Sequence, residues 1–160
     1  IDEGQPFKVI VDYAPEPASM TQLYTVIDTM KRNKVIHVLG SCGGGRDKAR
    51  RPVLGALAAD HADVVIVTNE DPYDDDPMQI INDVAEGARS KGKKDNETIF
   101  LIEDRKKAIT KAFELAGEGD IVVITGKGAE QAMCVAGGMK IPWDDRIVAR
   151  EALRALHKQI

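Results

Sequence analysis

The stretch VIHVLGSCGGGRDKARRP, residues 35–52, decides the fold class of this sequence. Its first five residues are almost all apolar and show no apolar–polar alternation, a pattern typical of a strand buried on both faces of a sheet. A glycine-rich turn follows, and Pro52 then suits the first turn of a helix. A strand, a turn and a helix in this order form the repeating unit of a parallel α/β sheet.

The same alternation of short strands and longer helices extends along the chain. Further strands are predicted at 8–11, 64–67, 98–102 and 121–124, and helices at 18–30, 52–62, 78–90, 105–115 and 146–157. Parallel strands need right-handed crossovers, and these helices are long enough to supply them. We therefore expect an α/β fold: one Rossmann-like domain over residues 1–160, with a mostly parallel sheet of about six strands and helices on both faces.

Composition excludes several classes of function. The chain has 160 residues, of which 43% are hydrophobic and 30% charged, values typical of a folded domain. Its formal net charge of −4 and its few aromatic residues argue against a nucleic-acid partner, and no apolar run is long enough to cross a membrane. Cys42 and Cys134 form no CxxC pattern, which favours the reducing cytoplasm. Because the chain begins at Ile1 and not at Met, we expect a piece of a longer protein.

Ligands of parallel sheets bind beyond the carboxyl ends of the strands, so the residues after each strand carry the functional information. Four glycines lie within residues 40–45, and a cluster of Arg46, Lys48, Arg50 and Arg51 follows. Glycines permit close backbone approach, and a helix N-terminus favours an anion. The segment therefore predicts an anion site, although a flexible loop with solvated cations is the alternative. It is not a Walker A loop, because GKS and GKT are absent from the chain.

Two further strand ends are informative. The segment 68–77 holds five carboxylates, which either stabilise the start of a helix or receive an ammonium group; it lacks the pattern of a calcium loop. Gly126, Lys127 and Gly128 follow another strand, and we expect them to open a helix. Structural roles are expected for the three histidines, and Cys42 is expected to be an inert small residue.

Taken in order, these segments resemble the C-terminal domain of the Mur ligase family, most closely of the group that adds the third amino acid. Residues 11–17 resemble the family's VDYAHTP, residues 43–52 its GGDRDKGKRP, and residues 68–77 its TSDNPRxEDP. Residues 126–130 resemble GKGHE, and residues 143–146 resemble the closing FDDRE. Each match alone is modest, but the ordered set covers nearly the whole chain.

The resemblance implies an ATP-dependent amide ligase of peptidoglycan synthesis, located in the cytoplasm. In that family ATP phosphorylates a carboxylate of a UDP-N-acetylmuramyl-dipeptide, and the amino group of the incoming amino acid displaces phosphate. The N-terminal and central domains hold the UDP-sugar, the P-loop and Mg2+. The C-terminal domain contributes to ATP binding, holds the amino acid, and closes over its own central domain to exclude water. Without a P-loop, these 160 residues are expected not to catalyse ligation alone.

The resemblance also assigns roles to individual residues. Arg46 matches the arginine that grips a carboxylate of the amino acid, and Glu130 is suited to hold an ammonium. Asp12 matches the aspartate that serves the nucleotide side of the cleft. The residues implied for amino-acid binding are Arg46, Glu70, Asp71, Tyr73, Gly126 and Glu130, and those for nucleotide binding are Asp12, Tyr13 and Pro15.

Three residues depart from the family pattern. Pro15 and Ala129 stand where the family has histidines, so any role of the histidine at position 15 is lost or supplied elsewhere. Tyr73 replaces an arginine that pairs with the distal carboxylate of diaminopimelate, and tyrosine cannot form a bidentate charged clamp. With carboxylates on either side of Tyr73, the third residue is expected to be L-lysine or another diamine and not meso-diaminopimelate.

Two other classes of protein remain open. One is a free-standing nucleotide- or amino-acid-binding module without a catalytic partner domain. The other is a ligase of the same superfamily with another acceptor, such as a folylpolyglutamate or cyanophycin synthetase.

Overall fold

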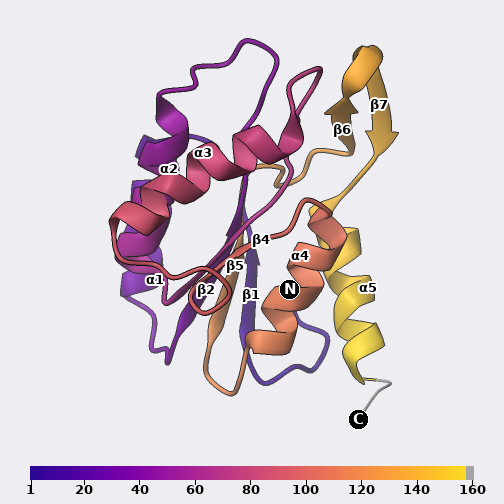
Figure 1. The fold of residues 1–160 in the computed structure, drawn as a ribbon. Helices are drawn as coiled ribbons and strands as arrows, with labels where there is room; N and C mark the ends of the chain where they lie inside the picture. The colour runs from indigo at the N-terminus through magenta and orange to yellow at the C-terminus, as the bar shows by residue number, and fades with distance from the viewer. Residues whose placement is uncertain (158–160) are drawn as a thin grey trace.

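The computed structural model describes residues 1–157 and shows an α/β domain in three layers (Figure 1). Short strands alternate with helices, as the sequence predicts. The strands of the main sheet are β1 (Lys8–Val11), β2 (Val35–Leu39), β3 (Val64–Val67), β4 (Ile99–Leu101) and β5 (Ile121–Ile124). The helices are α1 (Pro17–Asp28), α2 (Arg50–His61), α3 (Pro77–Ser90), α4 (Arg105–Leu115) and α5 (Asp145–His157).

All five strands of the main sheet run parallel, in the order β1-β5-β2-β3-β4. In register, Ile36 of β2 stands between Val122 of β5 and Val64 of β3. Because β5, β2 and β3 are consecutive in the sheet, the loops that follow them are neighbours at its carboxyl edge. These loops contain most of the residues that the sequence marks as functional.

Helices cover both faces of the sheet, which confirms the predicted fold class. Val35 and Leu39 of β2 pack on the face covered by α1, α2 and α3, whereas Ile36 and Val38 pack on the face covered by α4 and α5. The strands are buried on both faces, and this is why their sequences are continuous apolar runs. The predicted boundaries of the five strands and five helices agree with the observed ones to within two residues.

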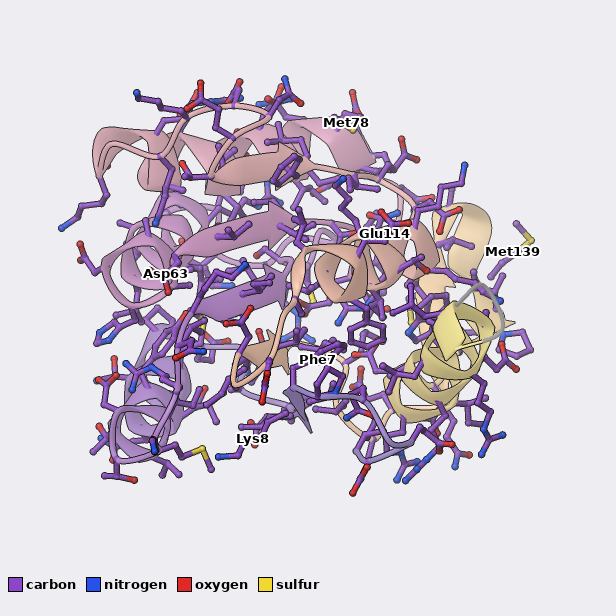
Figure 2. The ribbon with its side chains drawn as sticks, turned by 90° about the horizontal axis from the view of Figure 1, so that it is seen from below. Phe7, Lys8, Asp63, Met78, Glu114 and Met139 are labelled. Carbon is purple, nitrogen blue, oxygen red and sulfur yellow. The ribbon has the colours of Figure 1, made fainter. Side chains whose placement is uncertain are left out.

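The segment after β5 differs from the prediction. The expected helix at Gly126–Gly128 is wrong: the chain instead forms an antiparallel ribbon of β6 (Ala132–Val135) and β7 (Met139–Pro142), so the main sheet has five strands and not six. Hydrogen bonds to the backbone of Cys134 explain the difference. Its N–H donates to the Asp71 carboxylate, and its carbonyl oxygen accepts a hydrogen bond from the Tyr73 N–H. The ribbon thus satisfies its backbone against the loop after β3. Its tip, marked by Met139, lies at the outer rim of the molecule (Figure 2).

The helices of residues 1–157 are too short and too polar to cross a bilayer.

Candidate functional site

The candidate site lies at the carboxyl edge of the sheet, at the top of Figure 1. Three loops form it, and we name them by their composition. The glycine loop (residues 40–49) follows β2, the acidic loop (68–76) follows β3, and the lysine loop (125–131) follows β5. The short segment 12–16 after β1 borders the lysine loop.

The glycines in these loops let neighbouring segments pack against each other. A β-carbon on Gly44 would fall 2.7 Å from the ring of Tyr73, and one on Gly128 would fall 2.8 Å from the α-carbon of Tyr13. A β-carbon on Gly43 would fall 2.1 Å from the Pro72 carbonyl oxygen. The glycine loop therefore packs against the acidic loop, and the lysine loop packs against the segment after β1.

This packing brings together predicted residues from four strand ends. The phenol of Tyr13 is 54% exposed and lies within electrostatic reach of Glu130, Glu70 and Arg46. Partial burial and the Glu130 charge raise the pKa of Tyr13, whereas Arg46 acts in the opposite direction. One cation and two carboxylates from three separate loops thus act on one exposed aromatic side chain.

Glu70 lies at the centre of these loops. Its side chain is buried, and Oε1 accepts a hydrogen bond from Cys42 Sγ at 3.1 Å. Oε2 lies over Gly126, whose added β-carbon would fall 2.1 Å from it. Burial raises the pKa of the Glu70 carboxyl, while the Arg105 charge and the Cys42 hydrogen bond oppose that rise.

Lys127 supplies an ammonium group from the chain itself to the acidic loop. Its Nζ lies 2.9 Å from both carboxylate oxygens of Asp71 and 2.7 Å from Glu130. The side chain of Lys127 is 1% exposed. Burial disfavours its charge, but hydrogen bonds with Glu130 and Asp71 outweigh that effect and raise the pKa of Lys127. Asp71 and Glu130 therefore share the Lys127 ammonium, but the Glu130 side chain is 43% exposed and that of Asp71 only 11%, so Glu130 can also accept from a ligand.

The other carboxylates of the acidic loop have structural partners within the described chain. Asp76 caps α3 by accepting from the Met78 N–H, as expected of a helix start. Asp75 pairs with Arg51, and Asp74 accepts from the Gly137 N–H in the β6–β7 connection. The acidic loop thus does both things that its sequence suggests: Asp76 caps a helix, and Asp71 binds an ammonium group, that of Lys127.

The cations of the glycine loop and of the start of α2 divide into two groups. Arg50 pairs with Glu16, and Arg51 pairs with Asp83 and Asp75. Arg46 and Lys48 are exposed, and neither forms an ion pair within residues 1–157. Arg46 is thus a cation of this loop that is available to bind an anion. The anion site itself stays a prediction.

The residues predicted for the nucleotide side occupy the segment after β1. Asp12 accepts a hydrogen bond from the Ala14 N–H at 3.0 Å and so stabilises the turn before α1. Pro15 is partly buried next to that turn, and Tyr13 is exposed beside it. The segment thus combines an exposed aromatic side chain with a carboxylate that is half-buried.

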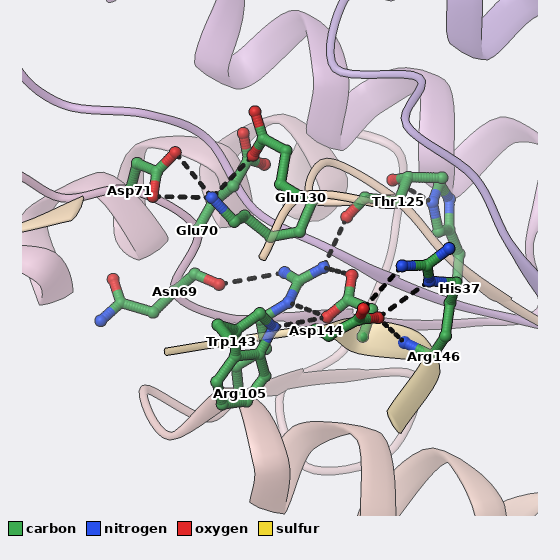
Figure 3. Close-up of polar contacts among 12 residues, drawn as sticks. His37, Asn69, Glu70, Asp71, Arg105, Thr125, Glu130, Trp143, Asp144 and Arg146 are labelled. Atoms are coloured by element: carbon green, nitrogen blue, oxygen red, sulfur yellow. Dashed lines mark hydrogen bonds and ion pairs between the residues drawn. The ribbon is translucent and has the colours of Figure 1, made fainter. Parts of the chain in front are cut away.

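Sequence reasoning missed a buried network below the loops (Figure 3). Arg105 and Asp145 form a bidentate ion pair, and the guanidinium also donates to the backbone carbonyls of Asn69 and Thr125. Arg105 was expected only as the first residue of a helix, and Asp145 only as part of a terminal motif. Nothing in their spacing, 40 residues apart, indicates that they meet.

A second buried contact links the sheet to the lysine loop. His37 in β2 lies between the hydroxyl of Tyr24 and Oγ1 of Thr125, 2.9 Å away. Burial lowers the pKa of His37 to about 3, so the ring is neutral. His61 stacks on Tyr24 with ring centroids 4.4 Å apart. These positions confirm the structural roles expected of both histidines; the side chain of His157 lies outside the described part.

A cleft of about 640 Å³ opens beside the acidic loop, between α4 and the ribbon. Met133, Ile141 and Trp143 form one wall, and Asn69 and Asp104 lie opposite. None of the site residues predicted from the sequence lines this cleft, so the predicted site is a convergence of loops next to it. Within the described residues, no group of three or more His, Cys, Asp or Glu side chains could hold a metal ion.

Comparisons with known proteins identify the family to which this fold is similar. Residues 1–128 match the family model described as Mur ligase, glutamate ligase domain. A UDP-N-acetylmuramyl-tripeptide synthetase from Roseiflexus sp. is 44% identical over 156 residues, which are 98% of this chain and 30% of that protein. A UDP-N-acetylmuramoyl-L-alanyl-D-glutamate–2,6-diaminopimelate ligase from Halalkalibacterium halodurans is 41% identical over 154 residues, 96% of this chain and 30% of its own.

The solved structure of a UDP-N-acetylmuramoyl-L-alanyl-D-glutamate–2,6-diaminopimelate ligase superposes with a TM-score of 0.84 at 35% identity. The superposition covers 98% of this chain and 31% of the other. The chain thus spans about 30% of the length of the curated relatives it matches.

Proposed function

The chain belongs to the Mur ligase family, as its glutamate ligase domain, and from this we propose that it is the amino-acid-binding and nucleotide-binding part of an ATP-dependent amide ligase. The complete ligase would have three domains, with the P-loop in a central domain outside these residues. It would act in the cytoplasm and join an amino acid to UDP-N-acetylmuramyl-dipeptide. The observation that carries the proposal is the convergence of three loops at the carboxyl edge of the sheet, where Cys42 donates to Glu70 and Lys127 joins Asp71 to Glu130.

We assign the amino acid to the space between the glycine loop and the lysine loop. The guanidinium of Arg46 is exposed and suits a carboxylate, which it can bind in a bidentate manner. Glu70 and Glu130 come from the acidic loop and the lysine loop and suit an ammonium. An α-amino acid would therefore be held by its carboxylate at Arg46 and by its α-ammonium at these carboxylates; once the ammonium has given up a proton, the amine is placed for attack on the activated carboxylate.

The geometry favours L-lysine or another diamine as the third amino acid. The ring of Tyr73 packs on Gly44, and its backbone is held by Cys134, so no cation from this position faces a second substrate carboxylate. Lys127 is fully engaged by Asp71 and Glu130. Next to Tyr73, a distal ammonium would meet the exposed carboxylate of Asp74, whereas a distal carboxylate would be repelled by it.

ATP and Mg2+ are the cofactors we propose for the complete protein. When bound, ATP supplies the phosphoryl group that activates the carboxylate, and Mg2+ offsets phosphate charge. The residues of this chain fit a contact to the nucleoside: Tyr13 offers an exposed ring, and Asp12 and Pro15 lie next to it. They do not fit a metal or triphosphate site, because no metal-binding cluster and no P-loop occur in the described part.

Turnover of the complete protein with single amino acids tests the proposal. We expect phosphate release that depends on L-lysine and on UDP-N-acetylmuramyl-dipeptide, with meso-diaminopimelate a much poorer substrate. Arg46→Ala should raise the KM for the amino acid at least tenfold and the KM for ATP by much less. Equal effects on both KM values would show that Arg46 is assigned to the wrong ligand.

The choice of amino acid has its own variant. Tyr73→Arg should improve use of diaminopimelate relative to lysine, because it restores a cation at this position. Preference of the unaltered protein for diaminopimelate would refute the lysine assignment. Binding of nucleotide or amino acid without any ligation would favour the alternative, a non-catalytic binding module.

A further inference from the structure

The guanidinium of Arg105 joins elements that are distant in sequence. Nε and Nη2 donate to the two carboxylate oxygens of Asp145 at 2.8 and 2.7 Å. Nη1 donates to the Asn69 carbonyl at 3.0 Å, and Nη2 also donates to the Thr125 carbonyl at 2.8 Å. One side chain therefore connects the start of α4, the start of α5, and the ends of β3 and β5.

The two carbonyls that Arg105 holds stand immediately before the proposed substrate-binding residues. Asn69 precedes Glu70, the central carboxylate of the acidic loop. Thr125 precedes Gly126 in the lysine loop. A displacement of either carbonyl would be transmitted across a single peptide unit to Glu70 or to Gly126.

The fit between the two loops leaves little room for such a displacement. Oε2 of Glu70 lies over Gly126, and Lys127 joins Asp71 of one loop to Glu130 of the other. Each of these contacts needs the ends of β3 and β5 at a fixed separation. Arg105 is the residue that binds both ends from below (Figure 3).

The surroundings of Arg105 fix its own orientation. The side chains of Arg105 and Asp145 are both fully buried. Trp143 donates its indole N–H to Asp145 Oδ1 at 2.9 Å, so the carboxylate is itself held in place. An arginine supplies this planar set of donors, whereas a lysine presents a point charge that cannot replace it.

On these observations we propose that Arg105, held by Asp145, is a positioning residue that sets the separation of the acidic and lysine loops and thereby shapes the amino-acid site. The inference rests on the proposed function for its substrate, but the placement of the loops does not depend on it. Arg105 touches neither substrate nor reacting atoms in this assignment. It acts through Glu70, Lys127 and Glu130.

The decisive variant is Arg105→Lys in the complete protein, which keeps the charge but removes the forked donors. We expect the KM for the amino acid to rise at least tenfold, with kcat and the KM for ATP changed less than twofold. Hydrogen exchange of the amides of residues 69–73 and 126–130 should become faster in the same variant. Asp145→Asn should change the same quantities in the same direction by a smaller factor.

The matched control is Asp120→Asn. Asp120 is also buried and bound by several donors, the N–H groups of Gly117 and Lys34 among them, but it precedes β5 at the opposite edge of the sheet. It should lose stability without any change in the KM for the amino acid or in exchange at the two loops.

The measurements separate the possible failures. If Arg105→Lys only lowers the folded fraction, the apparent kcat falls while the KM and the loop exchange stay at wild-type values, and the proposal is wrong. If the unaltered protein ligates no amino acid, the proposed function fails, and faster exchange at both loops still decides for or against positioning. Should Arg105→Lys not fold, Asp145→Asn provides the same comparison.

Discussion

The carboxylate of Glu70 lies directly over the α-carbon of Gly126: a β-carbon added there would fall 2.1 Å from Oε2 of Glu70. Gly126 also has a φ of +104°, a conformation that residues with side chains rarely adopt. The glycine that begins the lysine loop is therefore required by a neighbouring side chain and by its own backbone. A contact within the protein, and not only a ligand, explains a glycine that the sequence marks as functional.

Gly126→Ala should therefore destabilise the protein by more than the strain of placing an alanine at a positive φ. We expect a decrease of roughly 3 kcal/mol in the free energy of unfolding, because backbone strain adds to a clash that displaces Glu70. Urea denaturation of the two proteins measures the difference.

Gly92→Ala is the control for this variant. Gly92 has a φ of +89°, but an added β-carbon would meet nothing within 4 Å. It should cost about 1–2 kcal/mol, from backbone strain only. Equal losses for the two variants would contradict the close contact between Glu70 and Gly126.

The comparison of sequence and structure shows which features local patterns can predict. The strands were predictable because burial on both faces requires continuous apolar runs, as in Val64–Val67. The ribbon after β5 was not, because Cys134 finds its backbone partners in Asp71 and Tyr73, more than 60 residues earlier. Likewise, the composition of the acidic loop could not indicate that Lys127, from another loop, pairs with Asp71. Pairings between distant segments fix the part of the site that local sequence leaves open.

The thiol of Cys42 is predicted to react slowly with alkylating reagents. Burial, together with the charge and hydrogen bond of Glu70, raises the pKa of Cys42, so little thiolate exists at pH 8. In a Cys134→Ser background, iodoacetamide should label the folded protein at least tenfold more slowly than the urea-unfolded protein. Mass spectrometry of the labelled peptide gives both rates.

The role of Glu70 in this protection can be separated from simple burial. Glu70→Gln removes the negative charge and should increase the labelling rate of the folded protein. Rapid labelling of Cys42 in the unaltered protein would mean that the thiol is neither buried nor held by Glu70.

His37 is predicted to make stability depend on pH between about 6.5 and 3. Burial lowers its pKa to about 3 in the folded protein, so below about pH 6.5 the unfolded chain binds a proton that the folded chain does not. This contribution to stability is complete above pH 6.5, and it falls by about 1.4 kcal/mol for each pH unit below that. Chemical denaturation at pH 7.0, 6.0 and 5.0 measures the slope.

His37→Gln is the control, because glutamine does not titrate and can still bond to Tyr24 or Thr125. Glu70, whose pKa is raised, acts with the opposite sign as the pH falls, so the difference between the two proteins isolates the histidine. Identical slopes would show that His37 is accessible to protons in the folded state.

The ion pair between Lys127 and Asp71 is predicted to be strongly coupled. The side chains are 1% and 11% exposed, so removal of one partner leaves the other nearly buried and unpaired. Lys127→Met should therefore lower the free energy of unfolding by about 3–5 kcal/mol. Asp71→Asn retains an oxygen for the Cys134 N–H and should cost less, since Lys127 keeps Glu130 as a partner.

The double variant decides whether the pair acts as a unit. Once Asp71→Asn has removed the buried charge, Lys127→Met should cost about 2 kcal/mol less than it does alone, a coupling expected of directly contacting groups. The same variants report on the site, because Glu130 loses its partner in Lys127→Met but not in Asp71→Asn. The amino-acid KM should therefore rise more in Lys127→Met than in Asp71→Asn at equal folded fraction. Additive losses of stability, or equal KM values in the two variants, would mean that Lys127 does not join the acidic loop to Glu130.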